Sequence, residues 1–91
     1  MSIPFGTMLP GEKINFSLDL AAKIPAGQTL SSATVTARQF ASSINFTQVS
    51  VSGSKVVFRA EAVGVGRVIA DVIGTFSDGQ IDGDQIEIVV A

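Results

Sequence analysis

The chain has 91 residues, 46% of them hydrophobic and 15% charged, with a formal net charge of −2. It contains neither cysteine nor histidine, which excludes disulfides, thiolate metal sites and any mechanism built on a Ser–His or Cys–His pair. No apolar run reaches the roughly 18 residues of a membrane span, and we expect no signal sequence at the N-terminus. Tryptophan and tyrosine are absent and the few basic residues are scattered, so neither nucleic acid nor membrane is an expected partner.

Residues 1–11 form a segment of their own, which two prolines and two glycines interrupt. Proline cannot donate to a β-ladder and glycine weakens one, so a long regular strand is not expected here. Two interpretations stay open: a short first strand of the same domain, or an extended arm that docks on a neighbouring subunit. The candidate partner-binding residues of this segment are Ile3, Phe5, Met8 and Leu9.

Alternating apolar and polar residues dominate the rest of the chain, and this period of two is the pattern of strands that lie on a core. The predicted strands cover residues 12–20, 29–40, 43–52, 55–62 and 67–76, and a last one carries Ile86, Ile88 and Val90. Turn sequences separate them, among them Pro25-Ala26-Gly27, Ser52-Gly53-Ser54 and Asp78-Gly79. Such residues favour tight reversals of the backbone, and Ser52-Gly53-Ser54 and Asp78-Gly79 are expected to form hairpin turns.

One predicted strand contains a break in its pattern. In residues 43–52 the apolar positions shift from even numbers, Ile44 and Phe46, to odd numbers, Val49 and Val51. Because a shift of one residue turns every later side chain to the other face, the strand needs a β-bulge or a break near Thr47-Gln48.

The number and spacing of these strands predict the fold class. Six or seven strands, with turns about every 8–12 residues, are typical of an immunoglobulin-like antiparallel β-sandwich. We therefore expect an all-β domain over residues 12–91, with no helix longer than about two turns. The expected shared core contains Phe16, Phe46, Phe58, Val72 and Ile88.

The acidic residues near the C-terminal end are the one cluster that could bind a cation: Asp78, Asp82, Asp84 and Glu87. Their order does not fit the EF-hand loop, which places acids at positions 1, 3 and 5 and glycine at 6. A solvated hairpin is the favoured interpretation, and Gly64-Val65-Gly66 likewise indicates a tight turn. No catalytic, cofactor-binding or metal-binding residue is therefore assigned.

Several apolar residues fall on the less buried phase of their strands, and charge is scarce among their neighbours. Val57 and Ile73 are the two that we take as further candidates for partner binding. Since exposed apolar surface on a small domain marks contact sites, part of this outer phase is expected to be covered by a neighbouring subunit.

Two stretches together resemble a known family. The first is residues 9–19 with residues 26–35, and the second is residues 75–80 leading into residues 86–90. In this order and spacing they resemble small stand-alone virion proteins of tailed bacteriophages, which have an immunoglobulin-like fold and are labelled fibre or tail adaptor proteins. The resemblance implies a non-enzymatic structural protein without cofactors, made in the host bacterial cytoplasm and carried in the virion. Its implied partners are other capsid, tail or fibre proteins, in a homo-oligomer or multicopy assembly.

Two alternatives remain open. A capsid decoration (cement) protein would share the virion location, whereas an immunoglobulin-like adhesion or carbohydrate-binding module belongs to a different class. An enzyme is disfavoured because the usual general base and nucleophile, histidine and cysteine, are both missing.

Overall fold

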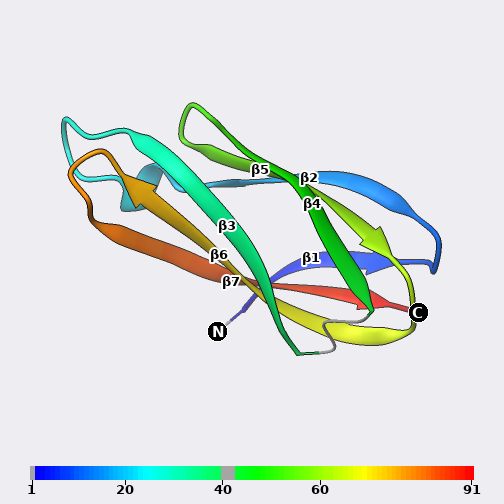
Figure 1. The fold of residues 1–91 in the computed structure, drawn as a ribbon. Helices are drawn as coiled ribbons and strands as arrows, with labels where there is room; N and C mark the ends of the chain where they lie inside the picture. Colours follow the sequence, from blue (N-terminus) through cyan, green and yellow to red (C-terminus); the bar gives the residue numbers. More distant parts are fainter. Residues whose placement is uncertain (1, 40–42) are drawn as a thin grey trace.

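The computed structural model describes residues 2–39 and 43–91, which form a β-sandwich (Figure 1). Seven strands lie within these residues: β1 (Ser2–Met8), β2 (Lys13–Asp19), β3 (Leu30–Gln39), β4 (Ile44–Ser52), β5 (Lys55–Ala62), β6 (Gly66–Phe76) and β7 (Ile81–Val90). In the same residues the helical structure is a single 3₁₀ turn, Ala21–Lys23. The described chain thus has no helix that is long and apolar enough to cross a membrane.

The strands form a four-stranded sheet in the order β1-β7-β6-β3 and a three-stranded sheet in the order β2-β5-β4. Strands β2, β4 and β5 therefore face β3, β6 and β7, which is the division of strands in an immunoglobulin-like sandwich. The neighbours pair antiparallel, except that β1 runs parallel to β7. The expected fold class is confirmed, and the parallel first strand is the one departure from an antiparallel design.

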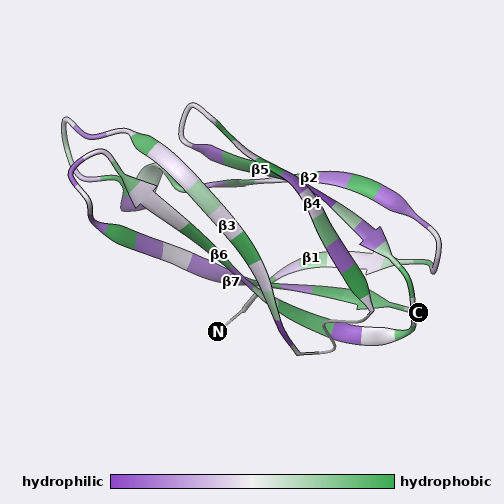
Figure 2. Ribbon diagram, in the orientation of Figure 1, coloured by the Kyte–Doolittle hydropathy of each residue, from purple (hydrophilic) through white to green (hydrophobic). Residues whose placement is uncertain are grey.

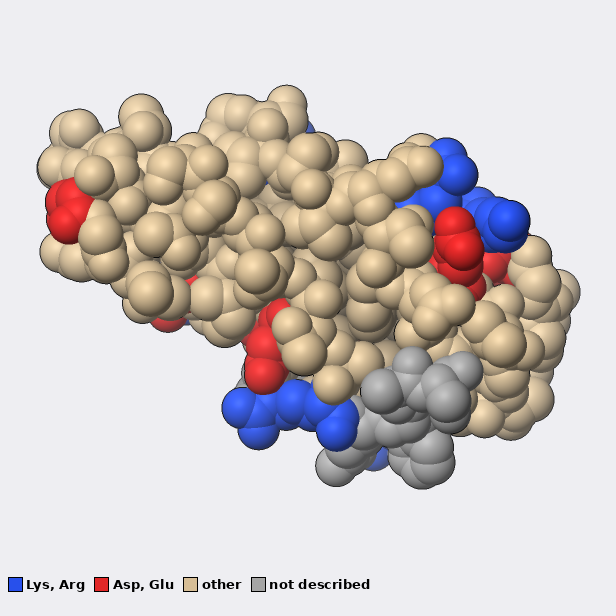
Figure 3. Space-filling view, in the orientation of Figure 1, with Lys and Arg blue, Asp and Glu red and all other residues tan. Residues whose placement is uncertain are grey.

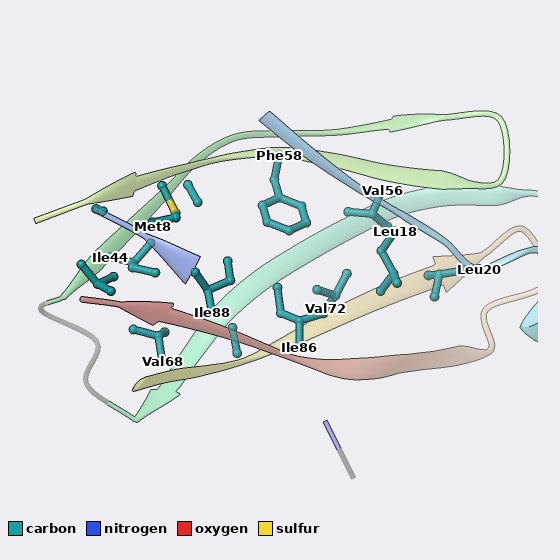
Figure 4. Close-up of a cluster of buried hydrophobic side chains, with 14 of the residues drawn as sticks. Met8, Leu18, Leu20, Ile44, Val56, Phe58, Val68, Val72, Ile86 and Ile88 are labelled. Carbon is teal, nitrogen blue, oxygen red and sulfur yellow. The ribbon is translucent and has the colours of Figure 1, made fainter. Parts of the chain in front are cut away.

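Alternation along the strands builds the core between the two sheets. In β5 and β6 every second residue is buried, from Val56 to Ala62 and from Val68 to Phe76. Figure 2 shows apolar and polar residues alternating along the strands. Side chains from both sheets meet in one cluster (Figure 4), among them Val56, Phe58, Val72, Ile86 and Ile88. Burial of apolar surface in this cluster is the main stabilising contribution to the fold.

Phe58 lies at the centre of an aromatic group. Its ring centroid lies 6.2 Å from that of Phe5, 6.0 Å from that of Phe16 and 5.7 Å from that of Phe46. Phe58, Val72 and Ile88 are buried as expected, whereas Phe16 and Phe46 are half-buried and pack against the core. The difference arises because Phe16 and Phe46 lie on β2 and β4, the two edge strands of their sheet, where one flank has no neighbouring strand.

The predicted irregularity in residues 43–52 is confirmed. The pairing of β4 with β5 shifts register between Thr47 and Ser50. Gln48 has a φ of 54°, in the left-handed region that non-glycine residues adopt infrequently. The bulge lets Ile44 before it and Val51 after it both pack toward the core despite their opposite parity. The predicted strand 29–40 is also present, although Phe40 lies outside the described residues.

Residues 2–8 form a strand of the same domain, so the structure corresponds to the first of the two interpretations of this segment. The register with β7 shifts between Pro4 and Gly6. Gly6 has a φ of 120°, which residues other than glycine rarely adopt. This bulge accommodates the proline and still leaves Met8 only 1% exposed, inside the core. Met8 is buried in the core and Phe5 packs against it, so these two apolar side chains have contacts within the domain, whereas docking of the segment on a neighbouring subunit stays a prediction.

Candidate interaction surfaces

Three exposed aliphatic side chains lie at one end of the sandwich, and we call them the loop-end patch: Leu9, Val63 and Val65. They are 61%, 59% and 73% exposed, respectively. Two hydrogen bonds link the β1–β2 connection, which carries Leu9, to the end of β5, which leads into Val63 and Val65. The Gly11 N–H donates to the Ala62 carbonyl (2.8 Å), and the Ala62 N–H donates to the Glu12 carbonyl (2.9 Å). Figure 1 shows the β1–β2 and β5–β6 connections at the end where the C-terminus lies.

The four candidates of the N-terminal segment are divided between core and surface. Leu9 belongs to the loop-end patch, and Ile3 is 38% exposed on the edge strand β1. Met8 is buried, and the half-buried Phe5 ring lies 5.5 Å from that of Phe16. Ile3 and Leu9 are therefore the two that this conformation leaves open to a partner.

Sequence reasoning alone misses Val63 and Val65. It interprets the stretch 64–66 only as a tight turn, and the structure does place these residues at the connection between β5 and β6. Turns usually carry polar residues that hydrogen-bond their own backbone, yet residues 63–66 are only valine and glycine. That lack of polar residues is the signal that could have identified the two valines as surface contacts.

Ile73 lies on the outer face of the four-stranded sheet, where it is half-buried opposite Thr34 of β3 and Gly83 of β7. Ile69 and Val89 occupy the same face and are also half-buried. Two ion pairs lie on this sheet, Arg38–Asp71 and Arg67–Glu87, each with a shortest N–O distance of 2.6 Å. Exposed pairs of this kind contribute little to stability, but they leave the face without unbalanced charge around its aliphatic residues.

Val57 lies on the outer face of the three-stranded sheet, in polar surroundings. Its cross-strand neighbours are Ser17 on β2 and Ser50 on β4. It lines an open hollow of about 370 Å³, whose one ionisable side chain, Arg59, donates to the Asn15 side-chain oxygen at 3.0 Å. With a serine opposite it on each neighbouring strand, Val57 offers little apolar area to a partner.

The acidic residues of the C-terminal hairpin point to different partners. Asp84 lies 3.5 Å from the Lys23 amine, and Glu87 pairs with Arg67. Asp78 and Asp82 each accept a hydrogen bond from a nearby backbone N–H, that of Gln80 at 3.0 Å and that of Gly83 at 2.7 Å. Within residues 2–39 and 43–91 no three carboxylates converge on a point where a metal ion could sit.

Charge is sparse on the surface as a whole. In Figure 3 the charged side chains on the face drawn form a few separate clusters, and uncharged residues cover the rest. Such a surface is suited to contacts made by shape and apolar area rather than by long-range attraction.

Comparisons with known proteins include a structural similarity. No protein-family model and no curated protein matches the chain. Among solved structures, the chain is similar to the solution structure of Amebosin, with 10% identity and a TM-score of 0.47 over 100% of this chain and 99% of that one.

Proposed function

We propose that this protein is a non-enzymatic structural protein of a bacteriophage virion, which attaches to a larger assembly as a fibre or tail adaptor. The observation that carries the proposal is the loop-end patch, where exposed aliphatic residues replace the polar residues usual in turns. The resemblance to small virion proteins of tailed phages supports the same role, and its first stretch begins at Leu9, a residue of the patch.

The turn that carries Leu9 is braced in place. The Glu12 carboxylate accepts the Leu9 N–H at 2.6 Å, and the Glu12 N–H donates to the Leu9 carbonyl at 3.1 Å. Leu9 thus lies on an ordered turn, so less conformational entropy is lost when a partner binds there. A small patch gives a weak contact, but many copies in one particle add avidity.

The test uses phage particles produced in a host that expresses either the wild-type protein or a variant. Val65→Asp places a charge in the loop-end patch. Ile81→Asp is the matched control, because Ile81 is 66% exposed at the other end of the sandwich, where it lies opposite Thr75 near the end of β6. Quantitative mass spectrometry of purified particles should find wild type and Ile81→Asp, and much less Val65→Asp.

Each outcome decides a different part of the proposal. Absence of the wild-type protein from purified particles would overturn the virion role. Equal incorporation of both variants would show that the loop-end patch is not the docking surface. Separation of heads from tails distinguishes the adaptor from a capsid decoration protein, since a decoration protein would fractionate with the heads.

A further inference from the structure

The two sheets have four edge strands, and three of them are interrupted. The register shifts between Pro4 and Gly6 in β1, at both ends of β3, and between Thr47 and Ser50 in β4. Bulges of this kind twist an edge away and keep it from pairing with another chain. Strand β2 has none, and its seven residues pair with β5 in one unbroken register. The free edge of β2 therefore lacks the protection that the other three have.

The backbone of β2 presents hydrogen-bonding groups along this edge. The Leu20 N–H donates to the Ser54 carbonyl and the Ala62 N–H to the Glu12 carbonyl, both at 2.9 Å. These two bonds lie at the two ends of the β2–β5 ladder, and both involve even-numbered residues that flank β2. Because alternate residues of an antiparallel strand direct their N–H and C=O groups to opposite sides, the even-numbered residues of β2 bond to β5. The N–H and C=O groups that point to the free edge belong to Lys13, Asn15, Ser17 and Asp19. In the described part of the chain no other strand pairs with them.

The sequence of β2 is symmetric in polarity about its central residue. From Lys13 to Asp19 it reads basic, apolar, polar, Phe16, polar, apolar, acidic. We propose that two copies of this chain pair antiparallel along β2, with Phe16 on the two-fold axis. In that register Lys13 lies opposite Asp19 of the second copy, Ile14 opposite its Leu18 and Asn15 opposite its Ser17. The unpaired groups of both edges then face one another, and the two three-stranded sheets become one continuous sheet.

Charge complementarity favours this register. Within one copy, Lys13 lies opposite Glu61 and Asp19 opposite Lys55. Across the pair, each row of charges therefore reads Glu61, Lys13, then Asp19 and Lys55 of the second copy, with alternating sign throughout. Opposite charges on facing strands stabilise a sheet. A slip by two residues would place Lys13 opposite Ser17 or Ala21 and lose these contacts.

Asp19 is prepared for such a contact. Its Oδ1 accepts hydrogen bonds from the Ala21 N–H at 2.9 Å and the Ser54 hydroxyl at 2.8 Å. These two bonds hold the pKa of the Asp19 carboxyl below its usual range, and the bond from the Ala21 N–H has the larger effect. The group is therefore charged at neutral pH. Its other oxygen accepts no hydrogen bond from the described residues and is free for Lys13 of the second copy.

The apolar residues of β2 also gain from the pairing. Ile14 and Phe16 are half-buried although they point toward the core, because their flank at the free edge is open. Their positions form non-hydrogen-bonded pairs across the two-fold axis, where facing side chains approach most closely. Pairing would bring the two Phe16 rings together and cover Ile14 with Leu18. This surface is distinct from the loop-end patch, so the dimer does not depend on the proposed virion role.

The first test is the mass of the full-length protein in solution, measured by analytical ultracentrifugation over a range of concentrations. Wild type should reach twice the mass of a 9.4 kDa chain. Ser17→Pro should remain a single chain, because proline removes an edge N–H and fills its place while leaving the bonds to β5 intact. Val65→Asp is the matched control and should dimerise like wild type. Circular dichroism should show the same β-rich fold in all three.

The second test is specific for the register and changes only exposed side chains. Lys13→Glu and Asp19→Lys should each be monomeric, since each sets like charges against one another in both rows. An equimolar mixture should form a heterodimer. In one row of that heterodimer the two substituted side chains face each other with opposite charge, and in the other row the native Lys13 faces the native Asp19. If Ser17→Pro fails to fold, these two variants still test whether β2 forms the dimer contact.

Several outcomes would overturn the inference. Wild type that stays monomeric at every concentration rules out the dimer, even if the protein is present in virions. Dimers of a folded Ser17→Pro, or loss of dimers in Val65→Asp alone, would assign the contact to another surface. A mixture of the charge variants that stays monomeric would show that residues 13 and 19 do not face each other.

Discussion

At the scale of single residues, Phe58 connects both sheets and both edges of the three-stranded sheet through its three aromatic neighbours. Phe58→Ala removes a fully buried ring and leaves a cavity that the surrounding strands fill only in part. We expect the free energy of unfolding to fall by about 3–5 kcal/mol. Urea denaturation followed by circular dichroism measures it, with the exposed Val63→Ala as control. A loss no larger than that of the control would contradict the central position of this ring.

Gly83 is a residue whose lack of a side chain matters. It lies on β7 opposite Ile73, and a Cβ built there would collide with the carbonyl oxygen of Val72. We expect Gly83→Ala to lower the free energy of unfolding by about 1–3 kcal/mol, because the backbone of β6 must move. Gly64→Ala is the matched control, since a Cβ at Gly64 meets open space. Thermal melts that show equal stability for both variants would argue against the close approach of β6 and β7.

At the scale of elements, the contribution of β1 to stability shows whether the first residues belong to the fold. Deletion of residues 2–10 removes the buried Met8 and the Phe5 ring that packs on Phe16. Loss of the Met8 side chain alone is expected to cost about 2–5 kcal/mol, so the melting temperature should fall well below that of wild type. Leu9→Ser is the control, because Leu9 is exposed and its loss should leave the melting temperature almost unchanged. A deletion variant as stable as wild type would instead fit an arm that is dispensable for folding.

At the scale of the whole molecule, the two outer sheet faces differ in what they offer a partner. Ile73 shares its face with Ile69 and Val89, whereas Val57 lies between Ser17 and Ser50 of the two neighbouring strands. Both positions are half-buried, so we expect Ile73→Lys and Val57→Lys to fold. Incorporation into virions, measured per purified particle, should fall for Ile73→Lys and stay near wild type for Val57→Lys. Normal incorporation of both would mean that neither sheet face is a contact surface.

The strands themselves were determined by the sequence. Alternation is a local property, because consecutive side chains of an extended chain point to opposite faces whatever they pair with. It therefore located β5 and β6 and the buried residues from Val56 to Phe76, and the change of parity after Phe46 located the bulge in β4. For the same reason it predicted the two-layer sandwich, since strands with one apolar face are stable only when those faces meet.

The tertiary structure decided which distant segments became neighbours. Nothing local in residues 2–8 specifies a parallel partner in β7, and nothing in residues 63–65 specifies contact with the turn after β1. The loop-end patch and the free edge of β2 exist only because of the strand order, which leaves β2 at the margin of its sheet. Strand order depends on how all the apolar faces and ladder bonds of the chain are satisfied together, and a pattern with a period of two residues carries no information about that choice.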